Sequence, residues 1–296
     1  MKRAAMIILT VAVVACLAFS QTTTAKPGQS APAQQGASAA PPQGKRPPQA
    51  KTQAEFDAYQ AAMKNSNDPS ALEKSADDFA AKYPDSELRG LLYRAAMHVY
   101  QNANNADKMR EMAEKELKID PDEPEALIGV AEVIAERTRD TDLDKDERWA
   151  QAQKDAQHAL ETINTDIAIP AGVPQEKIDA YKGFLKSAAY SVLGTLAFSQ
   201  EKYPEAEGYF HQSIDAYAAQ VDPVVVLRLA IALDKQQRYP DALKEANHAV
   251  ELTQENTSAG TLARRERDRL LQLTGGSSPT PTPKPPANTA PNPPSN

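Results

Sequence analysis

Apolar residues recur every three or four positions between residues 53 and 273, the spacing that places them on one side of an α-helix. The apolar segments come in pairs separated by short polar turns, and the strict alternation that marks β-strands is absent. Two of these turns carry nearly the same sequence 36 residues apart, KYPEA at residues 202–206 and RYPDA at residues 238–242. A repeat of this length is typical of stacked helical hairpins. We therefore predict an all-α array of helix pairs.

The unit around the first of these turns resembles the tetratricopeptide repeat (TPR) family. Six residues match the family pattern in order, namely Tyr190, Leu193, Gly194, Tyr203, Ala206 and Phe210. An earlier unit ends in Asp-Pro-x-x-Pro-Glu-Ala at residues 120–126, a connection that commonly opens the next repeat. The resemblance covers residues 53–273. It implies a TPR-like solenoid in which antiparallel hairpins stack into a right-handed superhelix and the first helices line a concave surface.

Two stretches interrupt the regular repeat. The second helix of the third pair is predicted to resume at Trp149, which leaves residues 138–148 as a long acidic connection. Residues 166–175 contain two prolines and a glycine, and they separate this pair from a long helix that begins near Glu176. At the end of the array, residues 262–273 predict a capping helix with a polar, arginine-rich face.

Residues 1–25 have the pattern of an export signal. Lys2 and Arg3 precede an apolar run, residues 6–15, that is short for a membrane span. A small-x-small site at residues 18–20 and a second site at 23–25 allow ordinary cleavage, whereas Cys16 ends a segment that resembles a bacterial lipobox. An uncleaved anchor is the third alternative. The protein is therefore predicted to be exported to the periplasm or beyond, or to be an outer-membrane lipoprotein held by lipid on Cys16.

Proline-rich segments flank the predicted array. Residues 26–52 are rich in Pro, Gln and Ala, and residues 274–296 are rich in Pro and Thr. Neither segment has enough large apolar residues to form a buried core, so we predict disordered linkers at both ends. Cys16 is the only cysteine of the chain, which excludes an intrachain disulfide. Helix packing must therefore stabilise the array.

Charge and candidate chemistry favour a binding protein over an enzyme. The formal net charge of -7 gives no reason to expect a nucleic acid partner. Alternating aspartates at positions 140 to 146 resemble a calcium loop, but Lys145 and Gln151 stand where a glycine and a bidentate carboxylate are needed. The four histidines are predicted to be surface or edge residues: His98, His158, His211 and His248. We find no candidate for a catalytic, metal or cofactor site.

The TPR resemblance implies which side chains face the concave surface. The predicted protein-binding residues are Arg94, His98, Gln101, Glu125, Ile128, Glu132, Ser191, Thr195, Phe198, Leu227, Ile231 and Asp234, with Leu91, Asn102, Glu136, Ser199 and Lys235 beside them. Ile128 and Glu132 occupy positions where a clamp for a peptide carboxylate would need hydrogen-bond donors. The expected ligand is therefore an extended or helical protein segment with apolar anchors and some basic character.

These observations predict a non-catalytic protein-interaction or assembly scaffold of the bacterial envelope. One alternative is an accessory subunit that holds a substrate for an envelope enzyme or secretion machine. A second alternative is an autonomous hydrolase whose site the sequence does not reveal. Any contact with a membrane is expected only through lipid on Cys16.

Overall fold

A computed structural model of the protein describes residues 44–275, and within this part the chain forms eleven α-helices and one short 3-10 helix. The predicted export signal with Cys16, residues 26–43 of the predicted linker and residues 276–296 of the predicted tail lie outside the described part. The α-helices are α1 (Gln53–Met63), α2 (Pro69–Lys82), α3 (Leu88–Asn102), α4 (Ala106–Leu117), α5 (Pro124–Arg137), α6 (Lys145–Thr162), α7 (Gln175–Ser199), α8 (Tyr203–Ala216), α9 (Pro223–Lys235), α10 (Tyr239–Glu251) and α11 (Ser258–Leu273).

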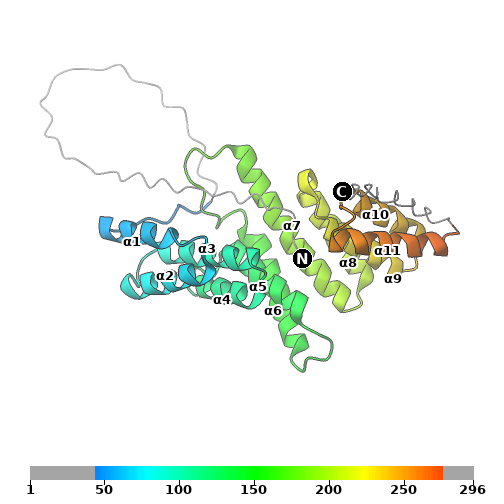
Figure 1. Ribbon diagram of the computed structural model, residues 1–296, viewed down its shortest axis with the longest axis horizontal. Helices are drawn as coiled ribbons and strands as arrows, with labels where there is room; N and C mark the ends of the chain where they lie inside the picture. Colours follow the sequence, from blue (N-terminus) through cyan, green and yellow to red (C-terminus); the bar gives the residue numbers. More distant parts are fainter. Residues whose placement is uncertain (1–43, 276–296) are drawn as a thin grey trace, which may run out of the picture.

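Consecutive helices pack as antiparallel pairs, and the pairs follow one another along an elongated array (Figure 1). The five hairpins are α1/α2, α3/α4, α5/α6, α7/α8 and α9/α10, and α11 covers the last of them. The prediction of an all-α array of hairpins is confirmed. Ala206 and Ala242, the equivalent residues of the two matching turns, are both completely buried, as close approach of the paired helices requires.

Local sequence sets where the helices begin. Side chains of Thr52, Asp68 and Asn105 accept hydrogen bonds from the backbone N–H groups of α1, α2 and α4, and proline lies in the first turn of α2, α5, α8, α9 and α10. The prediction for α6 was wrong at its start. This helix begins at Lys145, four residues before Trp149, because Asp146 and Glu147 in its first turn complement the helix dipole.

Three hairpin turns share one backbone geometry. Asn104, Glu201 and Gln237 each have a positive φ, between 54° and 61°, and each lies two residues before the second helix of its hairpin. The N–H of the following residue then donates to a carbonyl five residues back in the first helix, as Lys202 does to Ala197 at 2.9 Å. These bonds satisfy carbonyls at the end of the first helix. The shared turn shows that these hairpins are copies of one module.

α7 joins the two halves of the array (Figure 1). Leu185 and Ala189, near its middle, pack with Ile163 against α5 and α6. Ala197, near its end, packs with Phe210 in the core shared with α8, α9 and α10. The 25 residues of α7 therefore contribute to the apolar cores on both sides.

Candidate interaction surface

A buried polar cluster lies where α3, α4, α5 and α7 meet. We define it by six residues: Arg94, His98, Glu116, Glu123, Glu125 and Tyr181. Arg94 Nη2 lies 2.7 Å from Glu116 Oε1 and 2.9 Å from Glu123 Oε2. The three glutamates are only 0%, 2% and 8% exposed, so their charges are removed from water and depend on one another.

Glu125 connects three helices within this cluster. Its Oε1 lies 2.7 Å from His98 Nε2 on α3, and its Oε2 accepts a hydrogen bond of 2.9 Å from the Tyr181 hydroxyl on α7. Arg94 Nε lies 3.9 Å from the same Oε2. The predicted site residues Arg94, His98 and Glu125 are thus brought together. Through Tyr181 they connect α7 to the two preceding hairpins, while 23% of the Arg94 side chain and 27% of the His98 side chain stay exposed.

The pKa values of the three carboxyl groups in this cluster are shifted in opposite directions. Burial alone would raise the pKa of Glu125. The effects of His98, Arg94 and the Tyr181 hydroxyl outweigh burial and lower this pKa to about 2. Burial raises the pKa of Glu116 to about 7 and that of Glu123 to about 8, against the opposing effect of Arg94. The facing carboxylate of Glu125 raises the pKa of His98. Near neutral pH the cluster therefore retains protons that an exposed set of these residues would release.

A more open surface continues from the cluster over the later first helices. Arg228 on α9 donates from Nη1 to Thr195 Oγ1 on α7 at 2.9 Å, and its Nη2 lies 3.4 Å from Glu136 Oε1 on α5. These contacts show that α5, α7 and α9 present side chains to the same side. We call this surface the first-helix face and define it by residues that are at least partly exposed: Gln101, Glu132, Glu136, Ser191, Thr195, Phe198, Arg228 and Ile231.

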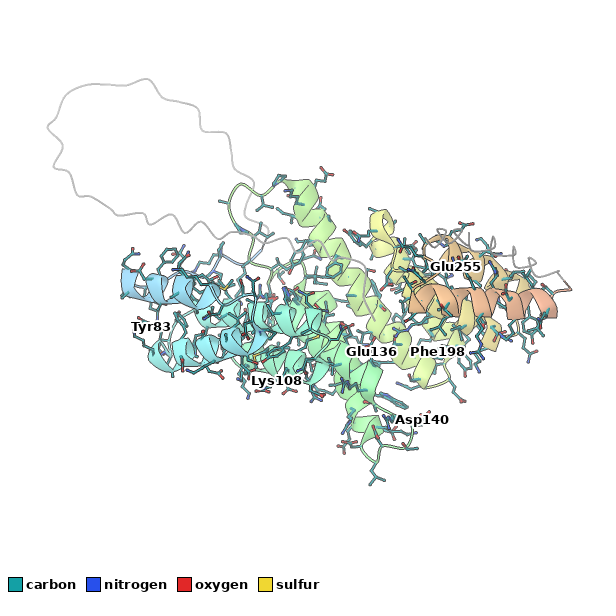
Figure 2. All side chains as sticks on the ribbon, in the orientation of Figure 1. Tyr83, Lys108, Glu136, Asp140, Phe198 and Glu255 are labelled. Carbon is teal, nitrogen blue, oxygen red and sulfur yellow. The ribbon has the colours of Figure 1, made fainter. Side chains whose placement is uncertain are left out.

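The first-helix face combines apolar and charged groups. The ring of Phe198 contacts the ring of Tyr203 edge to face, with centroids 5.4 Å apart, and remains half-buried. Phe198 follows Thr195 by three residues, and Ile231 follows Arg228 by three, so each apolar side chain lies beside a polar one on its own helix. Figure 2 labels Glu136 and Phe198 in the middle of the array. Apolar and polar side chains therefore lie next to one another along this face.

Three of the predicted surface residues lie elsewhere. Ile128 is 5% exposed beneath α7, where it packs with Leu185. Leu227 is 6% exposed and packs with Ala263 of α11. Asp234 forms a 2.6 Å ion pair with Arg269, also on α11. The predictions for Ile128 and Leu227 were wrong because the long α7 and the capping helix cover positions that a uniform repeat would leave open, whereas Asp234 stays partly exposed beside the capping helix.

Sequence reasoning also missed four polar residues of these surfaces: Glu116, Glu123, Tyr181 and Arg228. Glu123 and Glu125 flank the proline that begins α5. Two acidic residues this close to a helix start could have indicated a polar cluster from the sequence alone. Tyr181 lies in the part of α7 that extends beyond the repeat pattern, so no family position identifies it. The reach of Arg228 across three helices depends on their packing, which a linear pattern does not contain.

The acidic connection and His158 form ion pairs and hydrogen bonds with other side chains of the protein. Asp142 and Asp144 in the acidic connection lie near Arg148, at 3.7 Å and 2.8 Å. His158 Nε2 lies 2.7 Å from Asp122 Oδ1. Across residues 44–275, no group of histidine, cysteine and acidic side chains is arranged to hold a metal ion. His98 is partly exposed, as expected for an edge residue, but it also takes part in the buried polar cluster.

The described helices include none with the length and apolar character needed to cross a bilayer. No protein-family model matches the sequence, and a search of curated proteins gives no match. Solved structures do match. PilF of Pseudomonas aeruginosa is 16% identical with a TM-score of 0.52, and the alignment covers 75% of this chain and 87% of PilF. At this identity the likeness shows the fold alone.

Two further structures have lower TM-scores. PilW, described as a widely conserved type IV pilus biogenesis factor, is 19% identical with a TM-score of 0.47, over 75% of this chain and 99% of PilW. A tetratricopeptide repeat protein from Parabacteroides merdae is 12% identical with a TM-score of 0.37, over 74% and 88% of the two chains.

Proposed function

For a chain with the tetratricopeptide repeat fold, we propose the function of a non-catalytic protein-interaction or assembly scaffold that binds a protein segment along its first-helix face. The observation that carries this proposal is the reach of Arg228, which joins side chains of α5, α7 and α9 into one surface. Phe198 and Ile231 lie on this surface and offer apolar contacts. Helical hairpin arrays generally use such extended surfaces to bind other proteins.

The chemistry of this surface indicates the kind of partner. The first-helix face offers apolar side chains, and the whole chain has a formal net charge of -7. A segment with apolar anchors and some basic character is therefore complementary. The export signal pattern of residues 1–25 supports a location outside the cytoplasm, in the bacterial envelope. Lipid on Cys16 would add a membrane anchor to the same scaffold.

Site-specific photo-crosslinking tests the proposal. A photoreactive amino acid is placed at Ser191 or Ile231 on the first-helix face, with matched controls at the exposed Gln157 and Gln212 on second helices. We expect one protein to be crosslinked from the first two positions only. The purified partner should then bind the full chain in titrations, and Ile231→Arg should weaken this binding at least tenfold.

Two results would contradict the proposal. One is equal crosslinking from Gln157, Gln212 and the first-helix positions, which would place the interaction elsewhere. The other is turnover of peptidoglycan or peptide substrates by the purified chain at rates that follow its concentration. Turnover would favour the hydrolase alternative and would remove the scaffold as the primary function.

A further inference from the structure

The last residues of the predicted linker lie on the array. Residues 44–51, which we call the strap, lie beside the connections that precede α3, α5 and α7. Arg46 donates from Nη1 and Nη2 to the two carboxylate oxygens of Glu87, at 2.8 Å and 2.5 Å, and the backbone N–H of Gln49 donates to Glu87 Oε2 at 3.1 Å. Glu87 directly precedes α3, so this contact fixes the strap at the second hairpin.

The strap continues past the third hairpin to the fourth. Lys45 Nζ lies 2.6 Å from Asp120 Oδ2 in the connection between α4 and α5. The backbone of Lys45 also forms an isolated parallel bridge with Ala168, in the connection between α6 and α7. The strap thus contacts three connections on one edge of the array. From residue 44 to residue 46 it meets the α6–α7 connection, then the α4–α5 connection and then the α2–α3 connection.

Gly44 fits this edge in a way that other residues would not. Its φ of +130° is unfavourable for residues with a side chain, and a Cβ at this position would lie 2.5 Å from the carbonyl oxygen of Ile167. Pro47 and Pro48 restrict the backbone after Arg46 to extended conformations. The sequence Gly-Lys-Arg-Pro-Pro therefore combines close backbone approach, two positive charges and a stiff extended backbone.

This arrangement has the features of peptide recognition. Main-chain contacts align the segment, and Glu87 and Asp120 select for basic side chains. The ion pairs remain accessible to water, since the side chains of Arg46 and Lys45 are 63% and 43% exposed. Exposed pairs of this kind are individually weak, so the segment can leave the edge without unfolding the array.

We propose that the edge formed by Glu87, Asp120 and residues 167–168 is a second protein-binding site, specific for an extended segment with adjacent Lys and Arg followed by proline. The strap is its resident occupant, and a partner segment of the same chemistry displaces it. Because the strap is joined directly to α1, its effective concentration at the edge is high, on the order of millimolar. A free segment therefore binds weakly until the strap is released.

The test measures binding of a fluorescently labelled peptide with the sequence of residues 42–51 to the full chain by anisotropy. The Lys45→Ala/Arg46→Ala variant, with its strap released, is expected to bind the peptide at least tenfold more tightly than the unmodified chain. A Gly44→Ala variant releases the strap without a change in charge and should have the same effect. Higher salt should weaken the binding, since charge pairs contribute to it.

Two controls make the test specific. A peptide with Gln in place of Lys45 and Arg46 should not bind, and Glu87→Gln in the strap-released variant should reduce affinity for the original peptide at least fivefold. Equal affinity of the unmodified and strap-released chains, or no effect of Glu87→Gln, would overturn the proposal. Ile231→Arg should leave this binding unchanged, so failure here is distinguishable from failure of the first-helix face as a binding site.

Discussion

Gly194 on α7 and Phe210 on α8 approach so closely that a Cβ on the glycine would lie 2.5 Å from Cε1 of the phenylalanine ring. Phe210 is completely buried in the core between the helices, so its ring has little freedom to move. This contact explains physically why the repeat has a glycine in its first helix and an aromatic residue in its second.

Gly194→Ala should therefore destabilise the protein by about 1–3 kcal/mol through overpacking. The matched control is Gly208→Ala on α8, where no atom lies within 4 Å of the added Cβ. That variant should stabilise the protein by about 0.5–1 kcal/mol, because alanine is the better helix former. Chemical denaturation measures both changes. Equal unfolding midpoints for the two variants would show that the ring of Phe210 does not restrict this position.

The buried polar cluster gives a second prediction. Glu125→Ala removes the partner of His98 and the acceptor of the Tyr181 hydroxyl, and it should cost about 3 kcal/mol because other buried polar groups lose their pairing. Asp78→Ala is the control. It breaks the exposed Lys74–Asp78 ion pair and should change stability by less than about 0.5 kcal/mol. Thermal unfolding at pH 6 compares them, and similar losses in both variants would contradict the role of Glu125.

The same cluster predicts that stability decreases as the pH rises from about 5 to 8. Glu116, Glu123 and His98 all have raised pKa values, so in this range the folded state binds more protons than the unfolded state. Folding free energy then becomes less favourable with increasing pH, by an amount on the order of 2 kcal/mol. Glu125 has the opposite effect below pH 4.5. Because its pKa is lowered in the folded state, stability decreases there as the pH falls.

Glu123→Gln tests which group is responsible for the alkaline part of this profile. Glutamine keeps the shape of the protonated side chain but cannot ionise, so the variant should lose less stability between pH 5 and 8 than the unmodified chain. Denaturant unfolding at several pH values provides the measurement. An unchanged slope in this range would contradict the assignment of a retained proton to Glu123.

The shared turn geometry leads to a fourth prediction. Glu201 and Gln237 have φ values of 59° and 61°, a conformation that glycine adopts without the steric cost of a side chain. Glu201→Gly and Gln237→Gly should each raise stability by about 0.5–1 kcal/mol. The control is Gln212→Gly at an exposed position within α8, which should lower stability by about 1 kcal/mol. A loss of stability in all three variants would contradict the prediction.

The fold could be predicted from the sequence because it depends on local, repeated features. Ala206 and Ala242 occupy equivalent positions in two nearly identical segments, and both are buried as the repeat pattern requires. Helical spacing and turn residues act over a few positions, so they are visible in the sequence itself. The start of α6 was misplaced because the apolar pattern begins at Trp149, whereas the preceding acidic residues already belong to the helix.

The surfaces were less predictable because they depend on departures from the repeat. Ile128 was expected on an open surface, but the extension of α7 beyond the family pattern covers it. The contact of Tyr181 with Glu125 joins residues 56 positions apart and has no signature in either segment. The strap was assigned to a linker on its composition, and its contacts with Glu87 and Asp120 become visible only once the connections of the array are placed in space.

α7 determines how the array responds to stress, because one continuous helix supplies side chains to the apolar cores of both halves. In a uniform solenoid, terminal repeats can fray while the central ones persist. Here unfolding of either half would disrupt α7 and remove its side chains from the apolar core of the other half. The stabilities of the two halves are therefore coupled through α7. We therefore expect the two halves to unfold as one cooperative unit, so that a ligand bound to either half also stabilises the other.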